Sequence, residues 1–161
     1  MAKPPRNASP ESIARPSRTF FVTTSTFMRK SILQSDRNAT LLTEVFRSCV
    51  AAKHFRLHDF VIMPDHVHLL LTVSGETTVE KAMQFIKGGF SFRLKRETGH
   101  NGEVWQRGFS DHRVRDRESY KSHRTYIAMN PVRAGLAKSP EDFPWCLTNL
   151  ARQKAAQPER S

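Results

Sequence analysis

The feature that most constrains this chain is an apolar stretch, residues 60–72, that carries two histidines at alternate positions. Valine and leucine dominate its second half, which favours a β-strand. Successive side chains of a strand point to opposite faces, so the odd-numbered residues from Val67 to Val73 would line one face. The even-numbered residues from His66 to Thr72 would line the other. We therefore expect one face in the core and two imidazoles on the opposite face.

Two interpretations of the histidine pair stay open at this point. Side chains two residues apart on one strand face are about 7 Å apart at their roots, so both rings could lean toward a single metal ion. Half-buried histidines that only hydrogen-bond to a neighbour fit the same pattern, because imidazole is intermediate in burial preference. Residues elsewhere in the chain are needed to decide between them.

The charge balance indicates a polyanionic partner. The 161 residues include 26 Lys and Arg against 15 Asp and Glu, a formal net charge of +11, which favours nucleic acid over a membrane surface. No apolar run approaches the ~20 residues needed to cross a bilayer, and the first residues lack a signal-peptide core, so a cytoplasmic protein is expected. Cys49 and Cys146 have no Cys-x-x-Cys spacing and are expected to be buried, reduced thiols.

The spacing of apolar residues predicts the elements in order. Strands are expected at 19–27, 56–63, 66–73 and 109–115, and helices at 36–53, 77–96 and 117–129. The helix at 77–96 is expected to open with a capping box in which Thr77 is the N-cap and Glu80 reaches back. The order β-α-β-β-α-β, followed by a further helix, is that of a ferredoxin-like α+β sandwich with an antiparallel sheet.

One folded domain is expected over residues 19–150, since a chain of this length suits a single core. Residues 1–18 combine prolines with basic residues and predict a disordered basic arm. Residues 151–161 predict a polar, disordered tail. The pair Gly88-Gly89 in mid-helix costs about 1 kcal/mol per glycine relative to alanine, so close packing or a local break is expected there.

The last predicted helix adds polar side chains on one face. Tyr126 and Asn130 are four residues apart, with His123 nearby on the same stripe. A nucleophile and a third metal ligand could sit together there, but a tyrosine that packs through its apolar ring fits the same spacing. Pro131 is expected to end the regular helix.

Three motifs, taken in order, resemble the REP-associated tyrosine transposases, single-tyrosine members of the HUH endonuclease superfamily. They are residues 63–70 (MPDHVHLL), 104–112 (VWQRGFSDH) and 126–136 (YIAMNPVRAGL), and the resemblance covers about residues 19–145. Val67, between the two histidines, is hydrophobic as the family pattern requires. Ser110 departs from the pattern, in which an aromatic residue precedes Asp-His, but the departure leaves the metal and tyrosine positions intact.

The resemblance implies that His66, His68 and Asn130 hold a metal ion and that Tyr126 is the nucleophile. Tyr120 lies six residues earlier, rotated away from Asn130 on an ideal helix, and is assigned to packing. The family implies Mg²⁺ or Mn²⁺, although imidazole ligands would also accept Zn²⁺. It also implies attack on a DNA strand that leaves a 5′-phosphotyrosine and a free 3′-hydroxyl, so that strands can be rejoined.

The implied substrate is single-stranded or hairpin DNA of repetitive extragenic palindromes, which would associate the protein with the nucleoid. No protein partner is evident, and a monomer is favoured, with a dimer as the alternative. Basic residues that flank the motifs are expected to include contacts to the DNA backbone. They are Arg18, Lys87, Arg93, Arg107, Arg113, Arg115 and Arg133.

Two rival functions stay open. A protein that binds DNA hairpins without catalysis would not need the Tyr126 hydroxyl. A metal-dependent phosphodiesterase that uses water in place of the tyrosine would form no covalent adduct with DNA.

Overall fold

Four strands form one antiparallel sheet in the order β2-β3-β1-β4, in a computed structural model that describes residues 16–156. The strands are β1 (Arg18–Ser25), β2 (Arg56–Ile62), β3 (His66–Val73) and β4 (Ser110–Val114). The central pair, β1 and β3, is in register from Arg18 opposite Val73 to Ser25 opposite His66. The chain order and the strand order together are those of a ferredoxin-like sandwich, as predicted.

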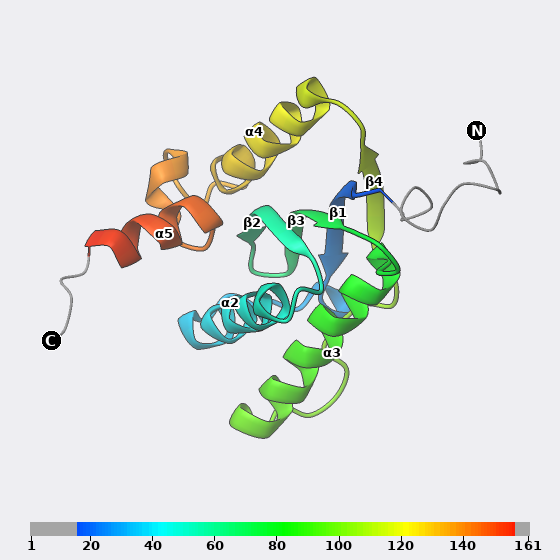
Figure 1. Ribbon diagram of the computed structural model, residues 1–161. Coiled ribbons are helices and arrows are strands. Elements are labelled where there is room, and N and C mark those ends of the chain that lie inside the picture. Colours follow the sequence, from blue (N-terminus) through cyan, green and yellow to red (C-terminus); the bar gives the residue numbers. More distant parts are fainter. Residues whose placement is uncertain (1–15, 157–161) are drawn as a thin grey trace, which may run out of the picture.

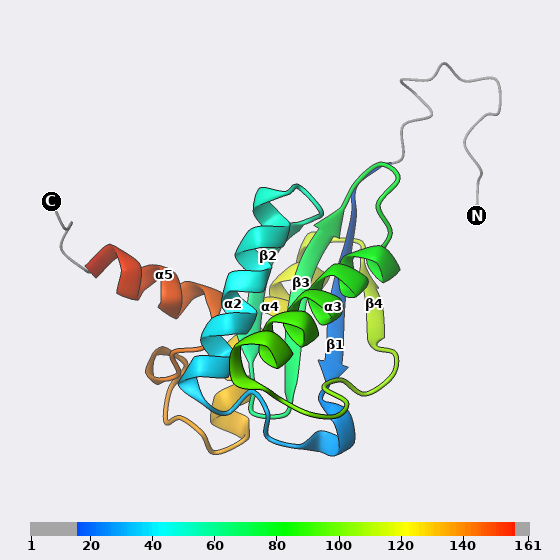
Figure 2. The ribbon, with the colours of Figure 1, turned by 90° about the horizontal axis from the view of Figure 1, so that it is seen from below.

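The helices lie in two layers, one on each face of the sheet (Figure 1). Helices α2 (Asp36–Ala51) and α3 (Val79–Thr98) cover one face, and α4 (Arg117–Arg133) covers the other. Figure 2 shows α2 and α3 side by side across the sheet, with α4 behind it. Helix α5 (Leu147–Ala156) lies against the edge strand β2, and short 3₁₀ turns occur at Phe27–Arg29 and Pro140–Asp142.

The larger core lies between the sheet and helices α2 and α3. The odd-numbered residues of β3, from Val67 to Val73, are fully buried in it. On the opposite face, Leu70 belongs to a smaller core under α4, and His68 lies on the same side. The alternation predicted for the histidine strand is confirmed.

Helices α2 and α3 approach each other closely at one of the two adjacent glycines. A Cβ on Gly89 would lie 3.2 Å from Cγ1 of Val45, whereas a Cβ on Gly88 would meet nothing within 4 Å. The close packing expected at this pair therefore holds for Gly89 alone, and α3 continues without a break.

Two local expectations about helix ends are wrong. The N-cap of α3 is Thr78, whose Oγ1 accepts a hydrogen bond from Lys81 N–H, so Glu80 is not in the position that closes a capping box. Helix α4 runs through Pro131 to Arg133. A proline this close to the helix end removes only its own N–H, and the last turn is still closed by N–H groups of Ala134 and Leu136.

Secondary structure extends past both ends of the predicted domain, residues 19–150. Arg18 is the first residue of β1, and its guanidinium donates to the carbonyl oxygens of Gly75 and Thr77 at 3.2 and 2.8 Å. A disordered tail was expected from residue 151, but helix α5 continues to Ala156. Its residues Leu147 and Leu150 pack against the larger core and hold the helix in place. The rest of the two segments, residues 1–15 and 157–161, lies outside the described residues.

Two further predictions concern the cysteines and membrane-spanning helices within residues 16–156. Cys49 is buried and Cys146 is half-buried, and both are free thiols. Within the same range, no helix has the length and apolar character needed to cross a membrane.

Candidate active site

Strand β3 holds the histidine pair on the face that α4 covers. The ring centroids of His66 and His68 are 4.8 Å apart, with an interplanar angle of 79°. His66 is half-buried, and His68 is 5% exposed. Because β3 is paired with β1 on one side and β2 on the other, its backbone fixes the separation of the two rings.

Each imidazole is oriented by a hydrogen bond to its Nδ1 atom. His66 Nδ1 lies 2.8 Å from Asp65 Oδ1, and the other oxygen of this carboxylate accepts from Arg29 Nε at 3.0 Å. His68 Nδ1 lies 2.7 Å from Thr23 Oγ1, on the neighbouring strand β1. Partners of this kind at one ring nitrogen fix the tautomer and present the other nitrogen, Nε2, to a ligand.

Burial keeps His68 neutral. Loss of solvent, followed by the nearby charges of His66, Arg133 and Arg29, lowers the pKa of His68 to about 3. At neutral pH the ring therefore carries no proton on one of its nitrogens, which is the form that binds metal ions.

Helix α4 brings Asn130 to the histidine pair, although the two lie 62 residues apart in sequence. The Asn130 side chain is 9% exposed, and its Nδ2 donates to His68 Nε2 at 3.2 Å. A half-turn of the amide would bring Oδ1 to the place that Nδ2 holds. The amide oxygen would then face the same space as the imidazole Nε2.

The residues present fit a divalent metal ion. Both imidazoles have their Nδ1 atoms engaged, His68 is neutral, and a buried amide meets the second ring. No cluster of three or more His, Cys, Asp and Glu side chains in the described part of the chain is arranged to bind a metal. The third protein ligand at this place would therefore be the Asn130 amide, and a neutral N/N/O set suits several divalent ions.

Tyr126 lies beside the same ring, one turn before Asn130. Its side chain is 42% exposed, and its ring centroid is 5.3 Å from that of His68 at an angle of 81°. The Arg133 guanidinium lies 4.2 Å from the Tyr126 ring centroid, and Arg133 Nη2 donates to the Tyr126 carbonyl oxygen at 3.2 Å. A hydroxyl-bearing side chain and a cation thus border the histidine pair and remain open to solvent.

The two neighbouring candidates on α4 lie elsewhere. Tyr120 packs in the smaller core, and its hydroxyl lies 3.3 Å from His58 Nδ1. His123 donates from Nδ1 to the Ser119 carbonyl oxygen at 2.7 Å, and Phe21 contacts both its ring and that of His68. Phe21 therefore lies between His123 and the proposed ligand His68.

The seven basic residues expected at DNA fall into two groups. Arg18, Lys87 and Arg93 have internal partners: Lys87 Nζ donates to the carbonyl oxygens of residues 106 and 108, and Arg93 pairs with Glu44 and Glu97. Arg107, Arg115 and Arg133 are exposed, although Arg133 also donates to the Tyr126 carbonyl oxygen, and the half-buried Arg113 lies over the Phe20 ring.

Sequence reasoning missed the residues that orient the two imidazoles. Asp65 directly precedes His66, so adjacency to a histidine ligand was a usable signal. No sequence signal pointed to Thr23, because its contact with His68 depends on the pairing of β1 with β3.

Comparison with known proteins decides the family. The family described as "Transposase IS200 like" matches residues 19–130, a range that contains both histidines, Tyr126 and Asn130. The chain belongs to the IS200-like transposase family. As a member, it belongs to a group of enzymes that cut and join DNA strands.

Two curated relatives of this family member carry the more specific name. The REP-associated tyrosine transposase of Escherichia coli is 26% identical over 128 residues, which cover 79% of this chain and 74% of that protein. A protein of Haemophilus influenzae, named as a candidate REP-associated tyrosine transposase, is 27% identical over 132 residues, 71% of this chain and 75% of that protein. The resemblance drawn from the three motifs is confirmed.

Solved structures share the fold. A REP-associated tyrosine transposase bound to a REP hairpin matches with a TM-score of 0.71 and 24% identity, over 88% of this chain and 82% of that chain. A candidate transposase from Deinococcus radiodurans matches with a TM-score of 0.56 and 20% identity, over 79% and 95% of the two chains. Because both identities are below 25%, these two matches show that the fold is shared.

Proposed function

We propose that this protein is a metal-dependent endonuclease and strand transferase for single-stranded DNA, with Tyr126 as its nucleophile. The observation that carries the proposal is the meeting of Tyr126 and Asn130, from α4, with the two oriented imidazoles of β3. The names of the curated relatives support the same chemistry.

Tyr126 would attack a backbone phosphate of the DNA. The phenol oxygen forms a bond to phosphorus, the bond from phosphorus to the 3′ oxygen breaks, and this oxygen takes up a proton as the phenol loses one. The products are a 5′-phosphotyrosine and a free 3′-hydroxyl. Because the adduct keeps a phosphodiester bond, a second 3′-hydroxyl can reverse the step and rejoin strands without ATP.

The chain's own residues would prepare this step. The Arg133 guanidinium lies close enough to the Tyr126 ring to stabilise negative charge that develops on the phenol oxygen. Asp65 and Thr23 would hold the two imidazoles in one orientation through their hydrogen bonds to Nδ1. The 42% exposure of Tyr126 leaves room for a DNA strand beside it.

His66, His68 and Asn130 would hold the metal ion, Mg²⁺ or Mn²⁺. When bound, such an ion polarises a non-bridging phosphate oxygen and stabilises the charge of the transition state. The neutral state of His68 at pH 7 supports this role, because a protonated imidazole would repel the ion.

Single-stranded or hairpin DNA is the proposed substrate, since one structural relative is a transposase bound to a REP hairpin. Of the seven basic residues, the exposed Arg107, Arg115 and Arg133 are the first candidates for backbone contacts, followed by Arg113. Arg18, Lys87 and Arg93 would have to share or release their internal partners to reach DNA. We place the protein in the cytoplasm, on the nucleoid, and as a monomer.

The test is to mix the protein with DNA hairpins from the flanks of its own gene, with Mg²⁺ or Mn²⁺, and to look for a covalent adduct by denaturing electrophoresis and mass spectrometry. The adduct should map to the Tyr126 peptide, disappear with EDTA, and be absent in Tyr126→Phe. Tyr120→Phe is the matched control, because it removes the same hydroxyl from the same helix and should keep the adduct.

Two outcomes would contradict the proposal. Tight hairpin binding without cleavage in folded protein would favour a binder without catalysis. Cleavage without an adduct, retained in Tyr126→Phe, would favour water as the nucleophile.

A further inference from the structure

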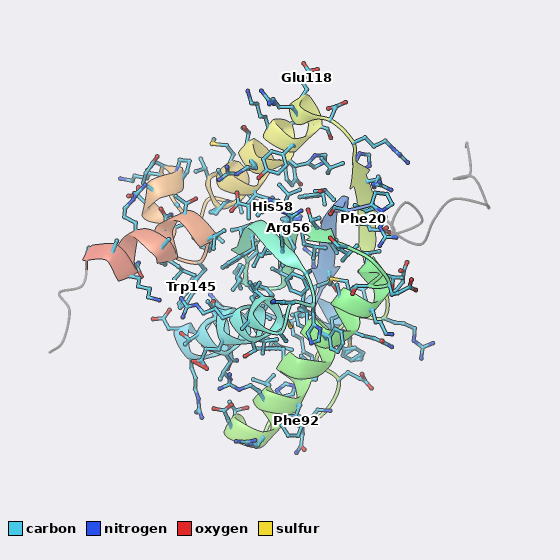
Figure 3. All side chains as sticks on the ribbon, viewed as in Figure 1. Phe20, Arg56, His58, Phe92, Glu118 and Trp145 are labelled. Carbon is cyan, nitrogen blue, oxygen red and sulfur yellow. The ribbon has the colours of Figure 1, made fainter. Side chains whose placement is uncertain are left out.

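The solvent side of α3 carries two exposed aromatic side chains that the catalytic site does not explain. Phe85 is 38% exposed and Phe92 is 62% exposed. They are seven residues apart and therefore lie on one stripe of the helix. Figure 3 shows Phe92 at the outer end of α3, on the side of the molecule away from α4. Grouped exposed aromatics of this kind mark interaction surfaces more often than isolated ones do.

Cations lie at both ends of this stripe. Lys81 is four residues before Phe85, and Arg96 is four residues after Phe92, with its guanidinium 5.8 Å from the Phe92 ring centroid. The two carboxylates of α3 lie on other faces of the helix, and Glu97 is paired with Arg93 at 2.7 Å. The stripe thus reads cation, aromatic, aromatic, cation, with no acidic residue of α3 on it.

A second aromatic ring stacks on Phe85. His54, in the connection between α2 and β2, stacks on Phe85 with centroids 3.6 Å apart and an interplanar angle of 7°. His54 therefore covers one face of the Phe85 ring and fixes its orientation, so an unpaired base can stack only on an outer face of this pair.

Of the two glycines between Phe85 and Phe92, Gly88 has no packing role. A Cβ on Gly88 would meet nothing within 4 Å, in contrast to Gly89, which packs against Val45. A mid-helix glycine lowers helix stability. Because packing does not require a glycine at position 88, its presence there needs another explanation. At Gly88 the missing side chain leaves the surface flat between Phe85 and Phe92.

We propose that this stripe, made of Lys81, Phe85, Gly88, Phe92, Arg96 and the stacked His54, is a second binding surface for single-stranded nucleic acid. Unpaired bases stack on the two phenylalanines, and Lys81 and Arg96 hold the adjacent phosphates. The surface lies on the α2 and α3 side of the sheet, opposite the layer that carries Tyr126.

The charge of the stripe selects nucleic acid over a protein partner. Aromatic rings alone would suit either, but cations at both ends with no acidic side chain on the stripe complement a polyanion. The proposal rests on the proposed function only in taking DNA as the strand, such as the unpaired segments beside a hairpin.

The test measures equilibrium binding of the full chain to a fluorescein-labelled oligothymidylate, which forms no hairpin, by fluorescence anisotropy. EDTA is present, so the result does not depend on cleavage by Tyr126. Phe85→Ala and Phe92→Ala should each weaken binding about tenfold, the effect of losing one stacked base. Val50→Ala is the matched control, because it truncates an exposed apolar side chain on α2, and it should leave the dissociation constant unchanged.

Further variants locate the effect on the stripe. Phe92→Tyr keeps a stacking ring and should bind as the wild type does. Gly88→Gln should raise the thermal midpoint of unfolding and still weaken binding, because its side chain would cover the flat surface. An oligonucleotide with 5-iododeoxyuridine should photocrosslink to the peptide that contains Phe85 or Phe92.

Unchanged binding in Phe92→Ala and Gly88→Gln, or equal weakening for the oligothymidylate and a DNA duplex, would overturn the proposal. Crosslinks found only on α4 would do the same and would leave a protein as the partner of the stripe. Should Phe92→Ala fail to fold, Gly88→Gln decides the question. If the wild type forms no Tyr126 adduct in Mg²⁺ or Mn²⁺, the proposed function alone is overturned, since oligothymidylate binding is measured separately in EDTA.

Discussion

The two faces of the sheet differ in how completely their helices are buried. On one face, seven of the 16 residues of α2 and six of the 20 residues of α3 are buried. On the other, α4 buries three of its 17 residues, and one of these is Asn130. The first face is closed by apolar packing, whereas the second keeps polar side chains in partial contact with solvent.

A single strand, β3, serves both faces independently. In β3, Leu69 points into the larger core and the adjacent His68 points toward α4. Leu69 therefore contributes to stability, and the adjacent His68 contributes to the proposed chemistry. A substitution of one residue should change mainly the unfolding free energy, and a substitution of the other should change mainly the activity.

The largest expected effect is on the α4 side, in His68→Leu. Loss of a proposed metal ligand should lower adduct formation more than about 100-fold, because removal of even an outer-shell partner typically costs 10–100-fold. Unfolding free energy should fall by about 1–3 kcal/mol, because Leu fills a similar volume but Thr23 and the buried Asn130 amide each lose a hydrogen-bond partner. Adduct yield and urea denaturation measure the two effects. Full activity in this variant would remove His68 from the site.

Leu69→Ala is the matched change on the other side of the same strand. Leu69 is fully buried, so the truncation should lower the unfolding free energy by about 2–5 kcal/mol in urea denaturation. Adduct yield per folded molecule should stay near that of the wild type. A Leu69→Ala variant that is fully stable but inactive would contradict the separation of the two faces.

Substitutions of Gly88 and Gly89 test how tightly α2 and α3 pack on the closed face. Gly88→Ala should raise the unfolding free energy by up to about 1 kcal/mol, because the new methyl group meets nothing. Gly89→Ala should gain less or lose stability, because its Cβ would lie 3.2 Å from Val45 Cγ1 and α2 would have to yield. Thermal or urea denaturation of the two variants compares them directly. Equal gains would show that the seam between α2 and α3 is looser than described.

The smallest expected effect concerns the link between α4 and β2. Burial raises the pKa of the Asp59 carboxyl. A hydrogen bond from Phe60 N–H and the charge of Arg124 lower this pKa, but burial has the larger effect. The native state then holds its proton to higher pH than the unfolded state, so unfolding free energy falls as pH rises from the unfolded pKa through the folded one. Asp59→Asn should remove this fall in denaturation curves measured across that window. Asp111→Asn, on the exposed edge strand β4, is the control that should keep it.

Local periodicity was sufficient for most of the fold. The two-residue repeat of β3 identified which side chains enter the core, and the four-residue spacing of Tyr126 and Asn130 placed them on one helix face. Helix ends were less certain, because several adjacent residues offer similar caps. Thr78 took the position expected for Thr77, and α4 continued through Pro131 because few residues remained in the helix beyond it.

The class of fold, the direction of each strand side chain and the residues available for chemistry could be predicted from the sequence, because these depend on contacts between near neighbours. The contacts between distant residues became visible only in the folded chain: Asn130 with His68, Thr23 with the same ring, and Lys87 with two loop carbonyls. Such pairings depend on strand register and on how α4 packs across the sheet. Both are set by the summed packing of the whole core, so no single segment encodes them.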